Sequence, residues 1–276
     1  MEMLFQYDFM RKAFIVGILL AVIVPCIGMI VVLRRLSMTG DALSHTSLAG
    51  VAIGIIAGIN PVLGASVACI FAAFGIEFIR KRFPKYSEIS IAIVMSSGVG
   101  LAGVLSGFVN NTANFTSFLF GSIVAITGFE LWLVVGISLL VITVFLLLYK
   151  ELMYMAFDEE AAQLSGIPVR TINTLFTILT ALTVSVASRT VGALIISSLM
   201  VIPVTCGMQY GKSYKQTLVY SIIFAVIFTI VGLTLSYYKG LKPGGTIVLT
   251  GVVFLMITFL IKGNKFNRGS RSYFPK

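Results

Sequence analysis

AFIVGILLAVIVPCIGMIVVL, residues 13–33, is an apolar run without a charged side chain. A helix of about 20 apolar residues crosses the roughly 30 Å hydrocarbon core of a bilayer. Similar runs follow at intervals as far as residue 261. They do not alternate apolar and polar residues over about 10 positions, as the strands of membrane barrels do. The sequence therefore predicts an all-α fold, a polytopic bundle of transmembrane helices.

The composition supports a membrane location over the whole chain. Hydrophobic residues make up 58% of the 276 positions and charged residues 11%, whereas soluble domains carry about 25% charged residues. We assign the net charge of +10 to loops on the cytoplasmic side and not to nucleic-acid binding. Cys26, Cys69 and Cys206 lie in apolar surroundings and are expected to be buried thiols. Residues 1–276 are predicted to form one domain, with 150–171 as its longest cytoplasmic loop.

The pattern predicts about eight or nine spans. Their expected ranges are 13–33, 40–59, 61–79, 89–108, 131–149, 172–187, 192–208, 217–237 and 246–261. An N-outside, C-inside arrangement places 15 of the 20 Lys and Arg residues in inside loops, which is the expected bias. The second span is short and polar. If it did not cross, all later loops would change sides and most Lys and Arg residues would lie outside, so the charge bias favours a crossing. Glu77 and Glu130 lie near span ends and are expected to snorkel to the interface.

The second span contains the most informative polar pair. Asp41 and His45 are four residues apart, and His45 is the only histidine of the chain. This spacing places both side chains on one helix face. An ionisable residue within a span indicates a functional site, and carboxylate with imidazole suits zinc or manganese. The alternative is structural: a carboxylate at a helix start and a histidine bonded to a neighbouring helix.

The loop at 150–171 predicts a short helix. Asp158, Glu159 and Glu160 would open it, because acids complement the positive end of the helix dipole. Gly166 and Pro168 would end it. A short acidic helix on a basic face is typical of a docking element. The alternative is a solvated helix at the membrane interface without a partner.

Two further segments bear on mechanism. Residues 207–213, GMQYGKS, place three residues between their glycines, whereas a phosphate-binding loop needs four. The chain therefore shows no energy source of its own. Residues 190–203 are rich in small and hydroxyl side chains, which favours close helix packing first and pathway lining second.

Together these features resemble the permease subunits of bacterial ABC importers for zinc and manganese. The resemblance covers nearly the whole chain. It is carried by Arg34–Arg35 leading into Gly40-Asp41 and His45, by 120–123 (FGSI), by 157–161 (FDEEA) with Gly166, by 191–194 (VGAL) running to Ile202–Pro203, and by 243–246 (PGGT).

This resemblance implies a homodimer of permeases in the bacterial cell membrane, two cytoplasmic ATP-binding subunits and an extracellular metal-binding lipoprotein. It places Asp41 and His45 on the translocation path. It makes Asp158–Gly166, including Glu159, Glu160 and Ala161, the helix that couples to the ATPase. Ser47 and Leu48 resemble zinc members more than manganese members. The implied chain is not an enzyme and holds no resident cofactor, since Zn2+ or Mn2+ passes through it as cargo.

The same residues leave three other functions to compare. A secondary transporter or channel could use Asp41 and His45 as a proton or ion relay. A membrane enzyme is disfavoured, because one histidine cannot supply a bis-histidine haem and the sequence has no HExxH or GxSxG motif. A permease for cobalamin or a siderophore would need a wide uncharged passage, which an Asp–His pair does not suit.

A dimer would also complete the predicted metal site. One chain offers one Asp and one His in the second span, whereas zinc takes four ligands in a closed site. Two chains around a two-fold axis would bring two copies of each.

Overall fold

The computed structural model describes residues 7–83, 86–109, 117–122 and 126–269. Within these ranges every regular element is a helix, which confirms the all-α prediction. Seven helices are long and apolar enough to cross a membrane. These are α1 (Asp8–Leu33), α3 (Pro61–Arg82), α4 (Ser87–Ser106), α6 (Gly128–Leu147), α9 (Val169–Thr190), α11 (Tyr214–Lys239) and α12 (Pro243–Gly269).

The two remaining predicted spans form helices that fall outside these seven. They are α2 (Met38–Ile56) and α10 (Ile196–Tyr210). The polar side chains of α2, Asp41 and His45 among them, lower its hydropathy. The other helix, α10, has only 15 residues, fewer than the roughly 20 that a bilayer core requires. Of the eight or nine predicted spans, seven therefore correspond to helices with the length and hydropathy of a membrane span.

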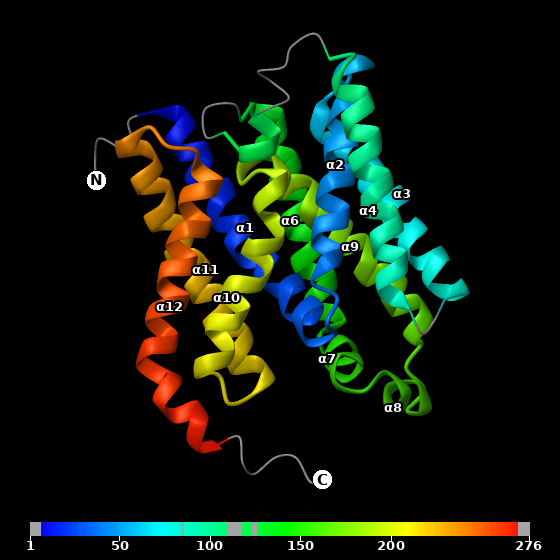
Figure 1. Ribbon diagram of the computed structural model, residues 1–276, viewed down its shortest axis with the longest axis vertical. Coiled ribbons are helices and arrows are strands. Elements are labelled where there is room, and N and C mark those ends of the chain that lie inside the picture. The colour runs from blue at the N-terminus through cyan, green and yellow to red at the C-terminus, as the bar shows by residue number, and fades with distance from the viewer. Residues whose placement is uncertain (1–6, 84–85, 110–116, 123–125, 270–276) are drawn as a thin grey trace.

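The helices form two groups joined by a central pair (Figure 1). One group consists of α2, α3 and α4, and the other of α1, α10, α11 and α12. Between them, α9 contacts α1, α2 and α3, while α6 packs on α1 and α9. Two short helices, α7 (Tyr149–Phe157) and α8 (Glu159–Leu164), lie together at one end of the bundle.

Close glycine contacts hold α2 inside its group. A Cβ atom built on Gly50 of α2 would lie 2.5 Å from the carbonyl oxygen of Gly64 on α3. Only glycine allows the two backbones to approach so closely. The α2 side chains of Ala42, Leu43 and Val51 are fully buried, so this polar helix is an interior element of the bundle.

The connection from α9 to α10 turns back into the bundle. Gly192 has a φ of +98°, a conformation that L residues with a side chain rarely adopt. A Cβ atom here would lie 2.5 Å from the backbone of Phe120. The following 3-10 helix, η2 (Ala193–Ile195), packs against α2. This turn shortens α10 and brings its first residues to the start of α2.

Candidate functional site

Asp41 and His45 lie where the spacing predicted, on one face of α2. Asp41 is in the first turn of the helix, His45 lies one turn further along, and both are half-buried. Met38 lies on the same face of α2, three residues before Asp41, and its side chain is 53% exposed. The face that carries the predicted pair is therefore partly open within a single protomer.

Ser197 is a partner of Asp41 that the sequence reasoning did not single out. Its Oγ donates a hydrogen bond to Asp41 Oδ1 at 2.5 Å. Ser197 is in the first turn of α10, so two helix starts meet at this carboxylate. Both present the positive end of a helix dipole, which stabilises a negative charge. The hydroxyl-rich character of residues 190–203 was the available signal, and it had been attributed mainly to packing.

The donor set of one chain is incomplete for a tight metal site. Among the residues that the structure describes, no three His, Cys, Asp or Glu side chains are grouped closely enough to hold a metal ion. Asp41 and His45 provide one oxygen donor group and one imidazole. This pair can engage a divalent ion but leaves most of its coordination sphere to water or to another chain.

The three cysteines are not part of this pair. Cys26, Cys69 and Cys206 are free thiols and all are buried, as predicted. Cys69 Sγ lies 3.3 Å from the carbonyl oxygen of Leu43, to which it donates. They serve as small packing residues of the interior.

The predicted acidic helix is present as α8. Asp158 is its N-cap, and the Asp158 carboxylate accepts a hydrogen bond from the Ala161 N–H at 2.9 Å. Gly166, with a φ of +85°, ends the segment. Leu164 is 90% exposed at the end of this helix. An apolar side chain displayed in this way on a short polar helix suits contact with another protein.

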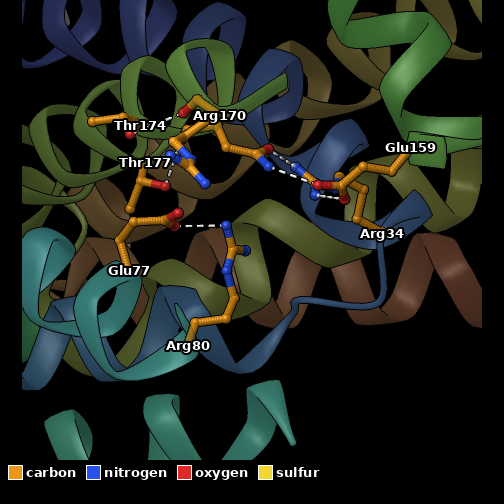
Figure 2. Close-up of polar contacts among 8 residues, drawn as sticks. Arg34, Glu77, Arg80, Glu159, Arg170, Thr174 and Thr177 are labelled. Atoms are coloured by element: carbon orange, nitrogen blue, oxygen red, sulfur yellow. Dashed lines mark hydrogen bonds and ion pairs between the residues drawn. The ribbon is translucent and has the colours of Figure 1, made fainter. Parts of the chain in front are cut away.

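Glu159 and Glu160 point in different directions. The Glu159 carboxylate accepts from the Arg34 guanidinium and, at 2.8 Å, from Asn173 Nδ2 (Figure 2). Arg34 Nη1 also donates to Asn173 Oδ1 at 2.5 Å. Glu160 is exposed. Both acids are exposed, and the Glu159 side chain retains 46% of its accessible surface, but only Glu159 also contacts Arg34 and Asn173. The sequence alone could not show this difference.

A cavity of about 900 Å³ opens beside these side chains. Its wall includes Arg34, Glu77, Arg80, Glu159 and Arg170. Burial lowers the pKa of Arg34 below its ordinary value, Glu159 counteracts this, and Arg80 adds to the lowering. An arginine nevertheless remains protonated in a protein, so the cavity has charged walls.

Glu77 and Glu130 do not snorkel to the interface, so that prediction was wrong. Glu77 is 7% exposed and accepts from Arg80 at 2.6 Å (Figure 2). Glu130 is 2% exposed, with its carboxylate 3.1 Å from Arg189 Nε. Each acid has a guanidinium nearby, which removes the need for water at the carboxylate.

The Glu130 pair joins several segments at the end of the bundle remote from α8. Glu130 also completes a capping box with Thr127 at the start of α6. Arg189, in the last turn of α9, lies over the Phe118 ring at 4.5 Å. One buried ion pair thus ties α6, α9 and the segment at Phe118 together.

Comparisons with known proteins agree with this architecture. The model of the ABC 3 transport family matches residues 6–262. A "Probable metal transport system membrane protein" of Treponema pallidum is 37% identical over 258 residues, covering 93% of this chain and 96% of that protein. The manganese import system permease protein ScaB of Streptococcus parasanguinis is 31% identical, covering 93% and 91%.

A solved structure has the same fold. The structure described as PsaBC from Streptococcus pneumoniae in complex with Fab aligns with a TM-score of 0.84 and 29% identity, covering 94% of this chain and 93% of that chain. The family match extends over nearly the whole chain, and seven apolar helices accompany it. This multi-pass membrane protein therefore belongs to the ABC 3 transport family, as the sequence resemblance predicted.

Proposed function

We propose that this chain is the membrane permease of an ATP-driven importer for a divalent transition-metal ion. The observation that carries the proposal is the Asp41–His45 pair, half-buried on one face of an interior helix. Intramembrane ionisable residues mark ion pathways, and this donor pair suits a divalent metal. Relatives that bear manganese or metal transport in their names support the same cargo class.

Manganese is the cargo that we place first. Carboxylate and imidazole donors accommodate both manganese and zinc, so the pair itself does not choose between them. The resemblance at Ser47 and Leu48 favoured zinc, but two groups of relatives are named for manganese. A competition uptake assay with the two ions would separate these alternatives.

We infer nine crossings with the N-terminus outside and the C-terminus inside. The seven long apolar helices would be joined by α2 and α10, which are packed among them. The start of α1 and the end of α12 lie at opposite ends of the bundle (Figure 1), as an odd number of crossings requires. The excess of Lys and Arg in the resulting inside loops supports this orientation.

The expected partners follow from the same features. A second copy would supply another Asp41 and His45 across a two-fold axis. A cytoplasmic ATP-binding subunit would dock on Asp158–Gly166, where Glu160 and Leu164 face outward. An extracellular metal-binding lipoprotein would deliver the ion. The chain would then hydrolyse no ATP itself.

Uptake into liposomes tests this proposal against a secondary transporter or channel. The purified chain is reconstituted with and without its ATP-binding subunit. Mn2+ or Zn2+ is supplied outside together with the metal-binding lipoprotein, and entry of the ion is followed with and without ATP. The importer requires both the subunit and ATP. Metal entry driven by an ion gradient in the chain alone would instead establish the relay function of Asp41 and His45.

A further inference from the structure

Three polar side chains from different parts of the chain form a closed set, which we call the Arg34 triad. Arg34 follows the last residue of α1, Glu159 opens α8, and Asn173 lies near the start of α9. Arg34 donates to both Asn173 and Glu159, and Asn173 donates to Glu159. Each member therefore contacts the other two (Figure 2).

Two of the three members are buried, while the Glu159 side chain is 46% exposed. Asn173 is 4% exposed, and the Arg34 side chain is largely buried. Charge-assisted hydrogen bonds are stronger than neutral ones, and exclusion of water strengthens them further. Loss of one member would leave a buried charge or amide without its partner. The three elements are therefore expected to move together at this contact.

The triad lies next to the start of the helix that carries the metal pair. Arg34 is followed by Arg35, which has a left-handed φ of +57°. Leu36 donates its N–H to Val31, and Thr39 donates to Leu36, so the turn into α2 is short and internally bonded. Asp41 follows in the first turn of α2. A shift of Arg34 would thus reach Asp41 through a few tightly connected residues.

Space for movement exists beside the triad, since all three of its members line the cavity. The cavity of about 900 Å³ is bordered by Glu159 and Gln163 of α8 and by Met155 of α7. Close-packed interiors resist displacement because neighbouring atoms must also move. An open volume beside α8 removes that obstacle. Arg34 and Asn173 line the same volume, so the triad connects α8 to α1 and α9 next to it.

We propose that the Arg34 triad transmits displacement of α8 to the start of α2, so that Arg34 and Asn173 position Asp41 and His45 during transport. This inference rests on the proposed function, in which α8 contacts the ATP-binding subunit. It assigns the adjacent acids different tasks: Glu160 faces the partner, and Glu159 connects α8 to the interior.

The test is the amount of metal transported per ATP hydrolysed by the reconstituted complex. Arg34→Gln and Asn173→Ala each remove hydrogen bonds of the triad while leaving the outward face of α8 unchanged. We expect normal copurification of the ATP-binding subunit and ATP hydrolysis within about twofold of wild type. Transport per ATP should fall about tenfold, the effect of losing hydrogen bonds to a charged group.

Arg170→Gln is the matched control. Arg170 lines the same cavity but is exposed and lies outside the triad, so its variant should keep the wild-type ratio. A double variant, Arg34→Gln with Glu159→Gln, should transport as much metal per ATP as Arg34→Gln alone, because the Arg34–Glu159 contact is already lost in the single variant. Should Arg34→Gln fail to assemble, Arg34→Lys keeps the charge but loses the forked geometry and serves in its place.

The outcomes separate the two proposals. If wild type shows ATP-dependent uptake but the triad variants keep the wild-type ratio, or if the paired losses add, the transmission role is wrong and the importer stands. If the wild-type complex shows no ATP-dependent metal uptake, the proposed function fails and the role of the triad fails with it.

Discussion

Substitution of His45 gives the most direct test of the metal-site hypothesis. It supplies the only imidazole of the chain, one turn from Asp41. We expect His45→Ala to lower ATP-dependent metal uptake about tenfold or more, since even a residue that only supports a metal ligand contributes 10–100-fold. Thr46→Ala, a neighbour bonded to the Ala42 carbonyl, is the matched control and should transport normally. Wild-type uptake by folded His45→Ala would exclude the imidazole as a ligand.

Glu130 is expected to contribute to the stability of the fold and not to transport. Its carboxylate is buried against Arg189 and also caps α6. Glu130→Gln should lower the free energy of unfolding by about 3–5 kcal/mol, the cost of removing one partner of a buried ion pair. Thermal unfolding in detergent would measure this as a lower midpoint.

The control for Glu130 is Glu88→Gln. Glu88 is also in the first turn of a helix but is exposed, so its replacement should change stability by no more than about 0.5 kcal/mol. The double variant Glu130→Gln with Arg189→Met should recover part of the loss because both charges of the buried pair are then removed. Equal midpoints for Glu130→Gln and Glu88→Gln would mean that the pair contributes little.

Among the elements, α8 is the one predicted to contact the ATP-binding subunit. Its outward residues are the acid Glu160 and the exposed apolar Leu164. Glu160→Lys with Leu164→Glu should weaken association with the ATP-binding subunit about 30-fold, as expected for replacing an interface residue worth about 2 kcal/mol. Copurification and titrated ATP hydrolysis would measure the loss.

Leu241→Glu is the matched control for α8. Leu241 is also an exposed apolar residue, but it lies in the turn between α11 and α12 at the other end of the bundle. Its replacement should leave association intact. A doubly substituted α8 that binds the ATP-binding subunit as tightly as wild type would assign docking to another element.

For the whole molecule, the prediction to test is that two copies of the chain surround the metal path. Met38 shares the face of Asp41 and His45 and is exposed in one protomer. In a chain with Cys26, Cys69 and Cys206 replaced, Met38→Cys should crosslink between protomers with a short bifunctional thiol reagent. The reason is that a two-fold axis through this face would bring the two α2 starts together.

Leu249→Cys controls for random encounters between protomers. Leu249 is exposed on α12, on the opposite flank of the bundle from α2, so it should remain uncrosslinked. A single copy of the chain in native mass spectrometry of the assembled complex would exclude the dimer. Crosslinking at Leu249 without crosslinking at Met38 would move the interface away from α2.

The sequence by itself determined the local properties of this protein. Helical class, the long apolar spans, the shared face of Asp41 and His45 and the short acidic helix all depend on composition and spacing within a few turns. The expectation for Glu77 and Glu130 failed because hydropathy shows where a charge sits along a span, but not how deeply the folded bundle buries it. Arg80 lies three residues from Glu77 on the same helix, whereas Arg189 reaches Glu130 only through the packing of α9 against α6.

Only the tertiary structure decided which distant residues meet. Ser197 binds Asp41 across 156 positions, and Arg34 binds Glu159 across 125. The turn at Gly192 brings α10 back to α2, and packing of α1 beside α9 brings Arg34 to Asn173. Such contacts arise from helix packing and from the need to pair buried polar groups. Neither leaves a periodic signal in the sequence, so the partners of Asp41 and Glu159 could be read only from the folded chain.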